Sequence, residues 1–368
     1  MKILYFYPDD GSYMAQWQKL HIVNEMQNHG HNIELFNPLN FNSLEAANCG
    51  LLKYLKSNQP YFDLFINSTG SDELFKETVL EIKKIGIRSL LICFDNLHAP
   101  FMHKEIAPLF DLVWLTSQET KYMFRKWGCN IVFMPYAANP LVFRPEYDNE
   151  LPVVGFIGMP YGSRINKLHR LTDSGIKCQV YYSSPQTYAD FSHGGSDYLS
   201  VLKTGLNLLK FDIGRKVILG AIKNKYISKV SATIVESPNL ERKPSVTFER
   251  MNYLYSNFAI SLGITELRNT YTLKKPVHKL HLRTFEIPMC GGLQLSSYTD
   301  ELAGYFENGK EIILYKSDEE MVSKAKFYLR EDNKHLRDNM KIMARKRAEN
   351  DHTWFRRFEI VFKALNIK

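Results

Sequence analysis

The sequence lacks the features that define several classes of protein. Its 368 residues contain no run of about 18 uncharged apolar residues, so no segment has the composition of a membrane-spanning helix. The five cysteines include no C-x-x-C pair, which argues against a structural zinc site and for a reducing compartment. The sequence also has no G-K-[ST] phosphate loop, no internal repeat and no low-complexity tract. With 45% hydrophobic and 23% charged residues, it has the composition of a globular protein of about two domains.

The charge balance is basic. Lysine and arginine number 47 against 39 aspartates and glutamates, which gives a net charge of +8. A surplus of this sign favours anionic partners such as nucleotides, nucleic acid or an anionic membrane surface. We therefore expect a cytoplasmic protein, with the inner face of the cytoplasmic membrane as one place where it could act.

Apolar strands alternate with helical patterns through the first part of the chain. A strand at 2–8 is followed by a helix at 14–28 and a second strand at 31–36. Further strands are predicted at 64–67, 89–94, 112–116 and 131–134. This alternation indicates a parallel sheet covered by helices on both faces. Four prolines between 135 and 152 then mark a linker.

A second series of strands follows the linker. Strands are predicted at 151–158, 177–183, 258–263, 292–296 and 312–315, and helices fill the last fifty residues. We expect an α/β protein of two doubly wound Rossmann-like domains that face each other across a cleft. The expected boundaries are 1–147 for the first domain, 148–350 for the second with an insertion at about 186–244, and 351–368 for a helix that packs back on the first domain.

The most informative segment is His281-Leu282-Arg283-Thr284-Phe285-Glu286-Ile287-Pro288-Met289-Cys290-Gly291-Gly292. On a helix, Arg283 and Glu286 share one face. A cation for phosphates beside a carboxylate for ribose hydroxyls suits a nucleoside diphosphate. The alternative is a surface ion pair followed by a glycine helix cap.

A second candidate is the loop Gly158-Met159-Pro160-Tyr161-Gly162-Ser163-Arg164, between a strand and a helix. Backbone N–H groups of a glycine turn and a helix N-terminus can bind an anion. Many such turns use glycine for steric reasons alone, so a phosphate contact and a purely structural turn both remain open. The corresponding turn of the first domain carries Asp9 and Asp10, which favours helix capping there.

Several motifs together resemble those of the CgeB-like (spore maturation protein type) glycosyltransferases. They are Gly155-Phe156-Ile157-Gly158, Tyr161-Gly162-Ser163-Arg164, Arg283-Thr284-Phe285-Glu286 with Cys290-Gly291-Gly292, Thr299-Asp300-Glu301-Leu302, Gly309-Lys310-Glu311 and His352-Thr353-Trp354. The resemblance covers most of the chain except 185–244. It implies glycosyltransferase fold B, related to the retaining family 4 transferases.

The resemblance also implies a function and a set of site residues. The expected activity is transfer of a sugar from a nucleotide-diphosphate sugar, a UDP-sugar first, in bacterial surface polysaccharide or glycoconjugate synthesis. The expected acceptor is a glycan, a lipid-linked molecule or a protein, and the expected reaction is retaining, metal-independent and free of any required cofactor. The implied donor site comprises Gly158, Arg164, His278, Arg283, Glu286, Gly291, Gly292, Asp300 and Glu301, with Arg283 also in a catalytic role. His278 departs from the family pattern, which has a glutamate there.

Acceptor-side candidates lie at a strand end in the first domain. Asp95 and His98 follow the apolar strand at 89–94 and are predicted to reach the cleft as catalytic groups.

The insertion reads as an interrupted amphipathic helix at 199–230. Seven basic residues face a single acid there, and Lys216, Lys223 and Lys225 are the expected contacts with an anionic membrane. A solvated basic face on a helix that packs against the second domain is the alternative. Two other functions stay open: a non-catalytic nucleotide-sugar or RNA-binding protein, and a fold-B nucleotide-sugar epimerase. The basic patch lacks the interleaved aromatics of nucleic-acid stacking platforms, so no nucleic-acid partner is expected.

Overall fold

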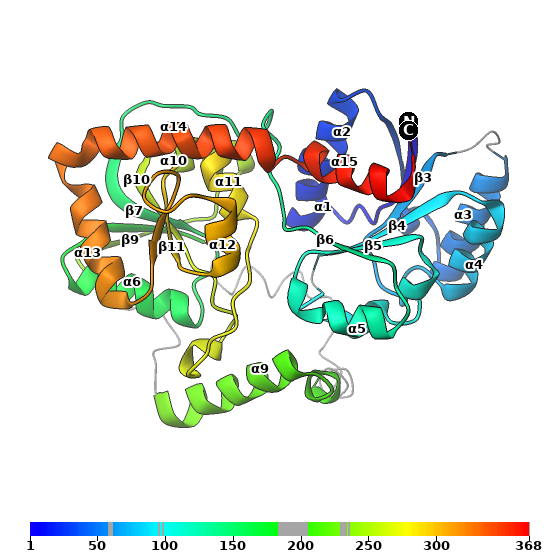
Figure 1. Cartoon of the computed structure of the whole chain (residues 1–368), viewed down its shortest axis with the longest axis horizontal. Helices are drawn as coiled ribbons and strands as arrows, with labels where there is room; N and C mark the ends of the chain where they lie inside the picture. The colour runs from blue at the N-terminus through cyan, green and yellow to red at the C-terminus, as the bar shows by residue number, and fades with distance from the viewer. Residues whose placement is uncertain are drawn as a thin grey trace. The chain divides into compact units, whose positions relative to one another are not determined.

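The computed structural model describes residues 1–57, 62–94, 96–97, 99–182, 205–228, 234 and 236–367. The chain forms two compact units, Met1–Asn139 with His352–Lys368, and Pro140–Asp351. Each unit contains one six-stranded sheet in which every described strand pairing is parallel (Figure 1). The predicted α/β class with two Rossmann-like domains is confirmed.

The sheet of the first unit has the order β2-β1-β3-β4-β5-β6. Its strands are β1 (Lys2–Phe6), β2 (Asn32–Phe36), β3 (Leu64–Asn67), β4 (Arg88–Cys93), β5 (Leu112–Leu115) and β6 (Ile131–Phe133). Its helices are α1 (Tyr13–Gln18), α2 (Asn24–Asn28), α3 (Leu44–Ser57), α4 (Lys76–Ile85), α5 (Lys121–Lys126) and α15 (Trp354–Leu365). The helix predicted at 14–28 is divided between α1 and α2 by a π-helical turn at Lys19–Val23.

The C-terminal helix α15 belongs to this first unit. Trp354 is fully buried and its ring lies 5.3 Å from that of Trp17 and 5.6 Å from that of Trp114. Buried Glu25 accepts hydrogen bonds from the backbone nitrogens of Trp354 (3.2 Å) and Phe355 (2.9 Å) at the start of α15. A carboxylate thus satisfies N–H groups that have no partner within the helix.

The sheet of the second unit has the order β12-β11-β10-β7-β8-β9. Its strands are β7 (Leu151–Ile157), β8 (Cys178–Tyr181), β9 (Leu240–Lys243), β10 (Phe258–Gly263), β11 (Gln294–Ser297) and β12 (Ile313–Tyr315). Its helices are α6 (Ser163–Asp173), α9 (Asp212–Lys223), α10 (Phe248–Asn257), α11 (Arg283–Met289), α12 (Asp300–Tyr305), α13 (Asp318–Leu329) and α14 (Lys334–Asp351). The strand order reverses direction between β7 and β10, where ligands of such sheets bind at the carboxyl ends of the strands.

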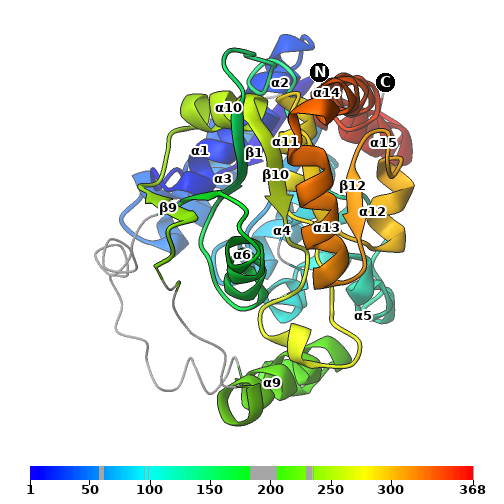
Figure 2. The same ribbon diagram turned by 90° about the vertical axis from the view of Figure 1, so that its left-hand side faces the viewer.

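Helices cover both faces of this second sheet (Figures 1 and 2). Alternate residues of β7, β8, β10, β11 and β12 pack with α6 and α13 in one apolar core that includes Val154, Leu168, Ile260 and Met321. Helix α11 contacts both α10 and α14 on the other side. The sheet is therefore buried on both faces, as the nearly continuous apolar strands predict.

The second unit begins earlier than the expected residue 148. Three side chains of α10 accept hydrogen bonds from backbone nitrogens of the segment that precedes β7. Asn252 accepts from Arg144 at 2.9 Å, Ser256 from Glu146 at 3.1 Å and Asn257 from Asp148 at 2.7 Å. The segment read as a linker therefore runs fixed along the second unit from Pro140. Within the described residues, no helix is both long and apolar enough to cross a membrane.

Candidate functional site

The turn after β7 brings a side chain against the backbone. Gly158 has φ +132°, and a Cβ at this position would collide with Nη2 of Arg283. Gly162, with φ +57°, ends the turn and caps α6. The same Nη2 donates to the carbonyl of Ile157 at 3.1 Å. Glycine is required at 158 because the guanidinium of Arg283 occupies the space that a side chain would fill.

Arg164 lies beside Arg283. It stands in the first turn of α6, is 5% exposed, and donates from Nη1 to the carbonyl of Met159 at 2.8 Å. The guanidinium carbons of both arginines approach the ring of Phe156, at 5.8 Å for Arg164 and 5.1 Å for Arg283. The sequence-predicted Gly158, Arg164 and Arg283 are thus brought together at the carboxyl end of β7.

Neither guanidinium group forms a close ion pair with a described residue, and Nε of both, with Nη1 of Arg283, is buried without a hydrogen-bond partner. Arg283 as a whole is half-buried and interacts with buried Tyr255, and Glu266 acts on Arg164 through its charge. Burial, and then the charge of Arg283, lower the pKa of Arg164 to about 10. Buried cations with unused donors at a helix N-terminus are the arrangement that binds an oxyanion.

A carboxylate that the sequence reasoning missed lies nearby. Glu266 follows β10, is 9% exposed, and pairs with Lys167 at 3.1 Å. Ser297 donates to it at 3.2 Å, and Lys167 also pairs with Asp318 at 3.0 Å. Glu266 lies just after the end of a predicted strand. Asp95 was proposed because it has the same kind of position, so this criterion could also have found Glu266.

His278 lies next to this carboxylate. The backbones of Glu266 and His278 form an antiparallel bridge, and Nδ1 of His278 is 2.8 Å from Oγ1 of Thr265. Burial lowers the pKa of His278, while Glu266 acts in the opposite direction. Glu266 therefore acts through its charge on both His278 and Arg164.

Glu286 and the two glycines share helix α11 with Arg283. Glu286 is one turn beyond Arg283 and 2% exposed. Gly291, with φ +69°, ends the helix where a Cβ would collide with the hydroxyl of Tyr147. A Cβ at Gly292 would lie 2.5 Å from the carbonyl of Tyr255. Packing and helix termination account for both glycines, and their role in nucleotide binding stays a prediction.

The remaining donor-site candidates lie after β11. Asp300 and Glu301 occupy the first turn of α12, and exposed Asp300 accepts a hydrogen bond from Tyr298 at 3.0 Å. Acidic residues in a first helical turn interact favourably with the helix dipole, and this alone explains why acidic residues occur at both positions. The acceptor-side candidates Asp95 and His98 lie outside the described residues. No cluster of metal-ligating side chains occurs among the residues that the structure describes.

The three predicted membrane-contact lysines lie on α9 and the turn after it. Lys216 pairs with Asp212 at 2.8 Å, Lys223 donates to the carbonyl of Thr272 at 2.9 Å, and Lys225 lies 5.3 Å from the ring of Tyr226. Helix α9 packs against the turn Thr270–Thr272 and lies at the edge of the second unit in both views (Figures 1 and 2).

Comparison with known proteins gives one family match. Residues 212–363 match a protein-family model described as glycosyl transferase-like. No curated protein sequence gives a significant match.

Solved structures share the fold of the whole chain. Sucrose-phosphate synthase from Thermosynechococcus elongatus has a TM-score of 0.56 at 12% identity, with 99% of each chain covered. An α-glucosyltransferase in complex with UDP and DNA has a TM-score of 0.61 at 14% identity, covering 100% of this chain and 99% of the other. Anabaena HepE in complex with UDP-glucose has a TM-score of 0.55 at 11% identity, again covering 100% and 99%. The two-domain fold is therefore that of the fold-B glycosyltransferases.

Proposed function

We propose that this chain is a glycosyltransferase that takes a sugar from a nucleotide-diphosphate sugar and passes it to an acceptor. One observation carries the proposal: Arg164 and Arg283 place two guanidinium groups with buried, unpartnered nitrogens beside the glycine turn after β7. A diphosphate supplies the charge and the acceptor oxygens that these groups lack. Such neighbours as HepE and the α-glucosyltransferase contain UDP, which supports a UDP-sugar as the donor.

The arginines have a direct role in the proposed reaction. As the glycosidic bond breaks, its electron pair leaves with the nucleoside diphosphate, and negative charge grows on the β-phosphate. Fixed cations at that position stabilise the transition state more than the ground state. Glu286 accepts hydrogen bonds from the ribose hydroxyls, and His278 lies on the sugar side. Because basic side chains and the α6 N-terminus neutralise the diphosphate, the reaction needs no metal ion.

The two units have different proposed roles. The unit Pro140–Asp351 binds the donor, and the unit Met1–Asn139 binds a glycan, lipid-linked or protein acceptor, with Asp95 and His98 as its candidate catalytic groups. The proposed reaction is retaining and serves bacterial surface polysaccharide or glycoconjugate synthesis, as the motifs of the CgeB-like enzymes suggest. Gly291, Gly292, Asp300 and Glu301 complete the proposed donor site.

Calorimetry with UDP, GDP, dTDP and ADP tests the donor assignment. One nucleotide should bind clearly more tightly than the others, and binding should persist in excess EDTA. Affinity that disappears with EDTA and returns with Mg²⁺ would contradict metal-free binding. No measurable affinity for any nucleoside diphosphate would contradict the proposed function.

Product analysis separates the proposal from its alternatives. A transferase releases the nucleoside diphosphate only when an acceptor is present, apart from slow hydrolysis. A nucleotide-sugar epimerase changes the sugar without any acceptor, and a binding protein leaves the nucleotide sugar intact. Binding of RNA more tightly than of any nucleoside diphosphate would favour the RNA-binding alternative.

A specific observation supports peripheral membrane binding as a second property. The segment from α9 to Tyr226 exposes apolar side chains beside its lysines: Leu219 is 55% exposed, Ile222 51% and Tyr226 68%. Apolar insertion together with basic residues is the combination that binds an anionic membrane surface reversibly.

Liposome sedimentation at low and high salt tests this property. The Leu219→Ser/Ile222→Ser variant and the Lys216→Glu/Lys225→Glu variant should both stay in the supernatant, whereas the Lys326→Glu control on α13 should sediment like the wild type. Wild-type protein that does not sediment with anionic vesicles at low salt would refute membrane binding.

A further inference from the structure

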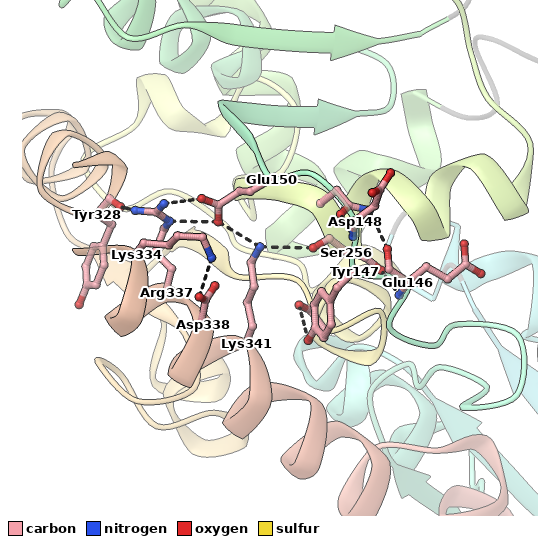
Figure 3. Close-up of polar contacts among 12 residues, drawn as sticks. Glu146, Tyr147, Asp148, Glu150, Ser256, Tyr328, Lys334, Arg337, Asp338 and Lys341 are labelled. Carbon is pink, nitrogen blue, oxygen red and sulfur yellow. Dashed lines mark hydrogen bonds and ion pairs between the residues drawn. The ribbon is translucent and has the colours of Figure 1, made fainter. Parts of the chain in front are cut away.

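A cavity of about 270 Å³ lies in the second unit near the amino ends of strands β7 and β10, opposite to the ends where the candidate donor site lies. Its walls come from the segment before β7, the end of α10 and one face of α14 (Figure 3). Glu150 directly precedes β7, and Ser256 and Asn257 directly precede β10. The cavity is thus at the amino ends of β7 and β10, while the arginine pair is at the carboxyl end of β7. Seven residues of β7 separate them, which is about 20 Å of strand.

The carboxylate in this cavity is already neutralised. Arg337, which is 1% exposed, donates from Nε to one oxygen of Glu150 at 3.2 Å and from Nη2 to the other. Its remaining nitrogen donates to the backbone carbonyls of Tyr328 and Arg330. Arg337 and Glu150 therefore form a complete, bidentate pair that requires no further partner.

Lys341 is the additional cation, and its contacts are poor. It is 4% exposed and one helical turn beyond Arg337 on α14. The acceptors recorded for its ammonium group are Oε2 of Glu150 at 3.5 Å and the carbonyl of Ser256 at 3.3 Å, both longer than usual for a charged donor (Figure 3). An ammonium group has three donors, so at least one has no recorded acceptor. Burial lowers the pKa of Lys341, and the charge of Glu150 opposes this only in part.

The other charged residues of the wall make no hydrogen bond to Lys341. Lys334 and Asp338 form an exposed pair at 2.6 Å, and Asp338 acts on Lys341 only through its charge, which raises the pKa of Lys341 as that of Glu150 does. Asp148 is exposed and accepts a hydrogen bond from Tyr253 at 3.0 Å. Tyr147 and Ile342, exposed by 54% and 59%, supply apolar surface at the mouth. The interior of the cavity thus contains a buried ammonium group with an unused donor, and the rim of the cavity is apolar.

We propose that this cavity is a second small-molecule site, separate from the donor site, for a compound that carries one carboxylate or phosphate group on a small apolar body. The oxyanion accepts from the ammonium of Lys341 and completes its coordination. The apolar body packs against Tyr147 and Ile342. The volume suits a ligand about the size of a single substituted ring, which is smaller than a nucleotide sugar.

Titration of the full-length protein with phenyl phosphate, benzoate and benzyl alcohol tests the site. The first two carry the oxyanion on a ring, and the third is an uncharged control of similar shape. Phenyl phosphate or benzoate should bind, and benzyl alcohol should bind at least ten-fold more weakly. Equal binding of all three, or of none of them up to 20 mM, would overturn the proposal.

Two variants and saturating UDP assign the binding to this cavity. Lys341→Met should lower the affinity for the anionic probe by about 10- to 100-fold, as expected for loss of a charge-assisted hydrogen bond. Lys346→Met, an exposed lysine on the same helix, should bind like the wild type. Saturating UDP should leave the binding of the probe at this cavity unchanged, because UDP occupies only the proposed donor site. Loss of probe binding with UDP but not in Lys341→Met would place the probe in the donor site and overturn the proposal.

A surface variant keeps the test valid if Lys341→Met does not fold. Ile342→Asp places a carboxylate at the exposed mouth of the cavity. Because it repels the anionic probe, this variant should lower the affinity for the probe by a similar factor. Met343→Asp, at the next position of α14, is the matched control and should bind as the wild type does. Equal affinity of the two aspartate variants would contradict binding at this cavity.

Discussion

Replacing Arg283 with methionine should stabilise the free protein and weaken its affinity for UDP. A structural arginine would give the opposite result for stability, because its removal costs packing and hydrogen bonds. Methionine keeps much of the apolar volume but removes the charge and the two buried nitrogens that have no partner. The two measurements therefore separate a ligand-binding cation from a structural one.

The magnitude follows from the neighbouring guanidinium. The pKa of Arg164 falls from 12.5 to about 10, and at 1.36 kcal/mol per pH unit this is roughly 3 kcal/mol against its charged form. Burial is the larger cause and the charge of Arg283 the second, so removing Arg283 relieves the smaller part of this cost, on the order of 1 kcal/mol. The unpartnered nitrogens of Arg283 cost about 1 kcal/mol or more, and the lost interactions with Ile157 and with buried Tyr255 offset about as much. We expect Arg283→Met to gain about 1 kcal/mol in unfolding free energy.

Binding should change in the other direction. Two charge-assisted hydrogen bonds to a diphosphate are worth about 3 kcal/mol together, so the affinity for UDP should fall about 100-fold. At a UDP concentration of 100 times the wild-type Kd, the ligand adds about 2.7 kcal/mol to the wild type but only about 0.4 kcal/mol to the variant. The variant should be the more stable protein without UDP and the less stable one with it.

Urea unfolding with and without UDP, together with calorimetry, measures all of these quantities. Arg250→Met is the matched control, because Arg250 is an exposed arginine whose guanidinium carbon lies 4.5 Å from the ring of Tyr253. It should change neither UDP affinity nor stability by more than about 0.5 kcal/mol. A free Arg283→Met protein that is less stable than the wild type by more than about 1 kcal/mol, with unchanged UDP affinity, would refute the reasoning.

Three further variants test other parts of the structure. Gly158→Ala should displace Arg283 and cost about 1–3 kcal/mol of stability as well as UDP affinity, whereas Gly304→Ala, with open space at its Cβ, should be neutral or slightly stabilising in the same urea titration. Glu286→Gln should lower the calorimetric affinity for UDP about ten-fold but change the affinity for pyrophosphate little, and equal losses for both would remove Glu286 from the ribose. Burial raises the pKa of Glu25 from 4.5 to about 7, so stability should fall by about 3 kcal/mol as pH rises from 4.5 through 7, and Glu25→Gln should flatten this dependence in urea titrations at pH 5 and 8.

The sequence predicted the layered architecture because its strands are short apolar runs bounded by glycine, proline and polar residues. The strand expected at 258–263 coincides with β10, and that expected at 151–158 differs from β7 by its final glycine. The helix expected at 14–28 was the weaker prediction. A π-helical turn interrupts it without any proline or glycine, so nothing in the local sequence marks the break.

The residues of the candidate site could be chosen from the sequence, but their electrostatic surroundings could not. Arg164, Gly158 and Arg283 were selected from their positions next to predicted strand and helix ends. That both guanidinium groups have buried nitrogens without a partner depends on the tertiary approach of α11 to the turn after β7, across more than a hundred residues of sequence. Periodicity describes single elements and contains no information about such an approach. The second cavity escaped prediction for the same reason, because Glu150, Ser256 and Lys341 come from three distant segments.

The histidine at position 278 shows how contact across a loop changes the meaning of a motif. The family pattern leads one to expect a glutamate there, and in the sequence its absence looks like the loss of a carboxylate. In the structure the backbone of His278 pairs with that of Glu266, so a carboxylate lies beside the same position, supplied from the strand end twelve residues earlier. Lys167 and Ser297 hold that carboxylate in place, and its charge opposes the effect of burial on the pKa of His278. The residue type at 278 therefore does not by itself determine the charge at this corner of the site. The bridge between two segments determines it, and the spacing of residues in one motif cannot reveal that bridge.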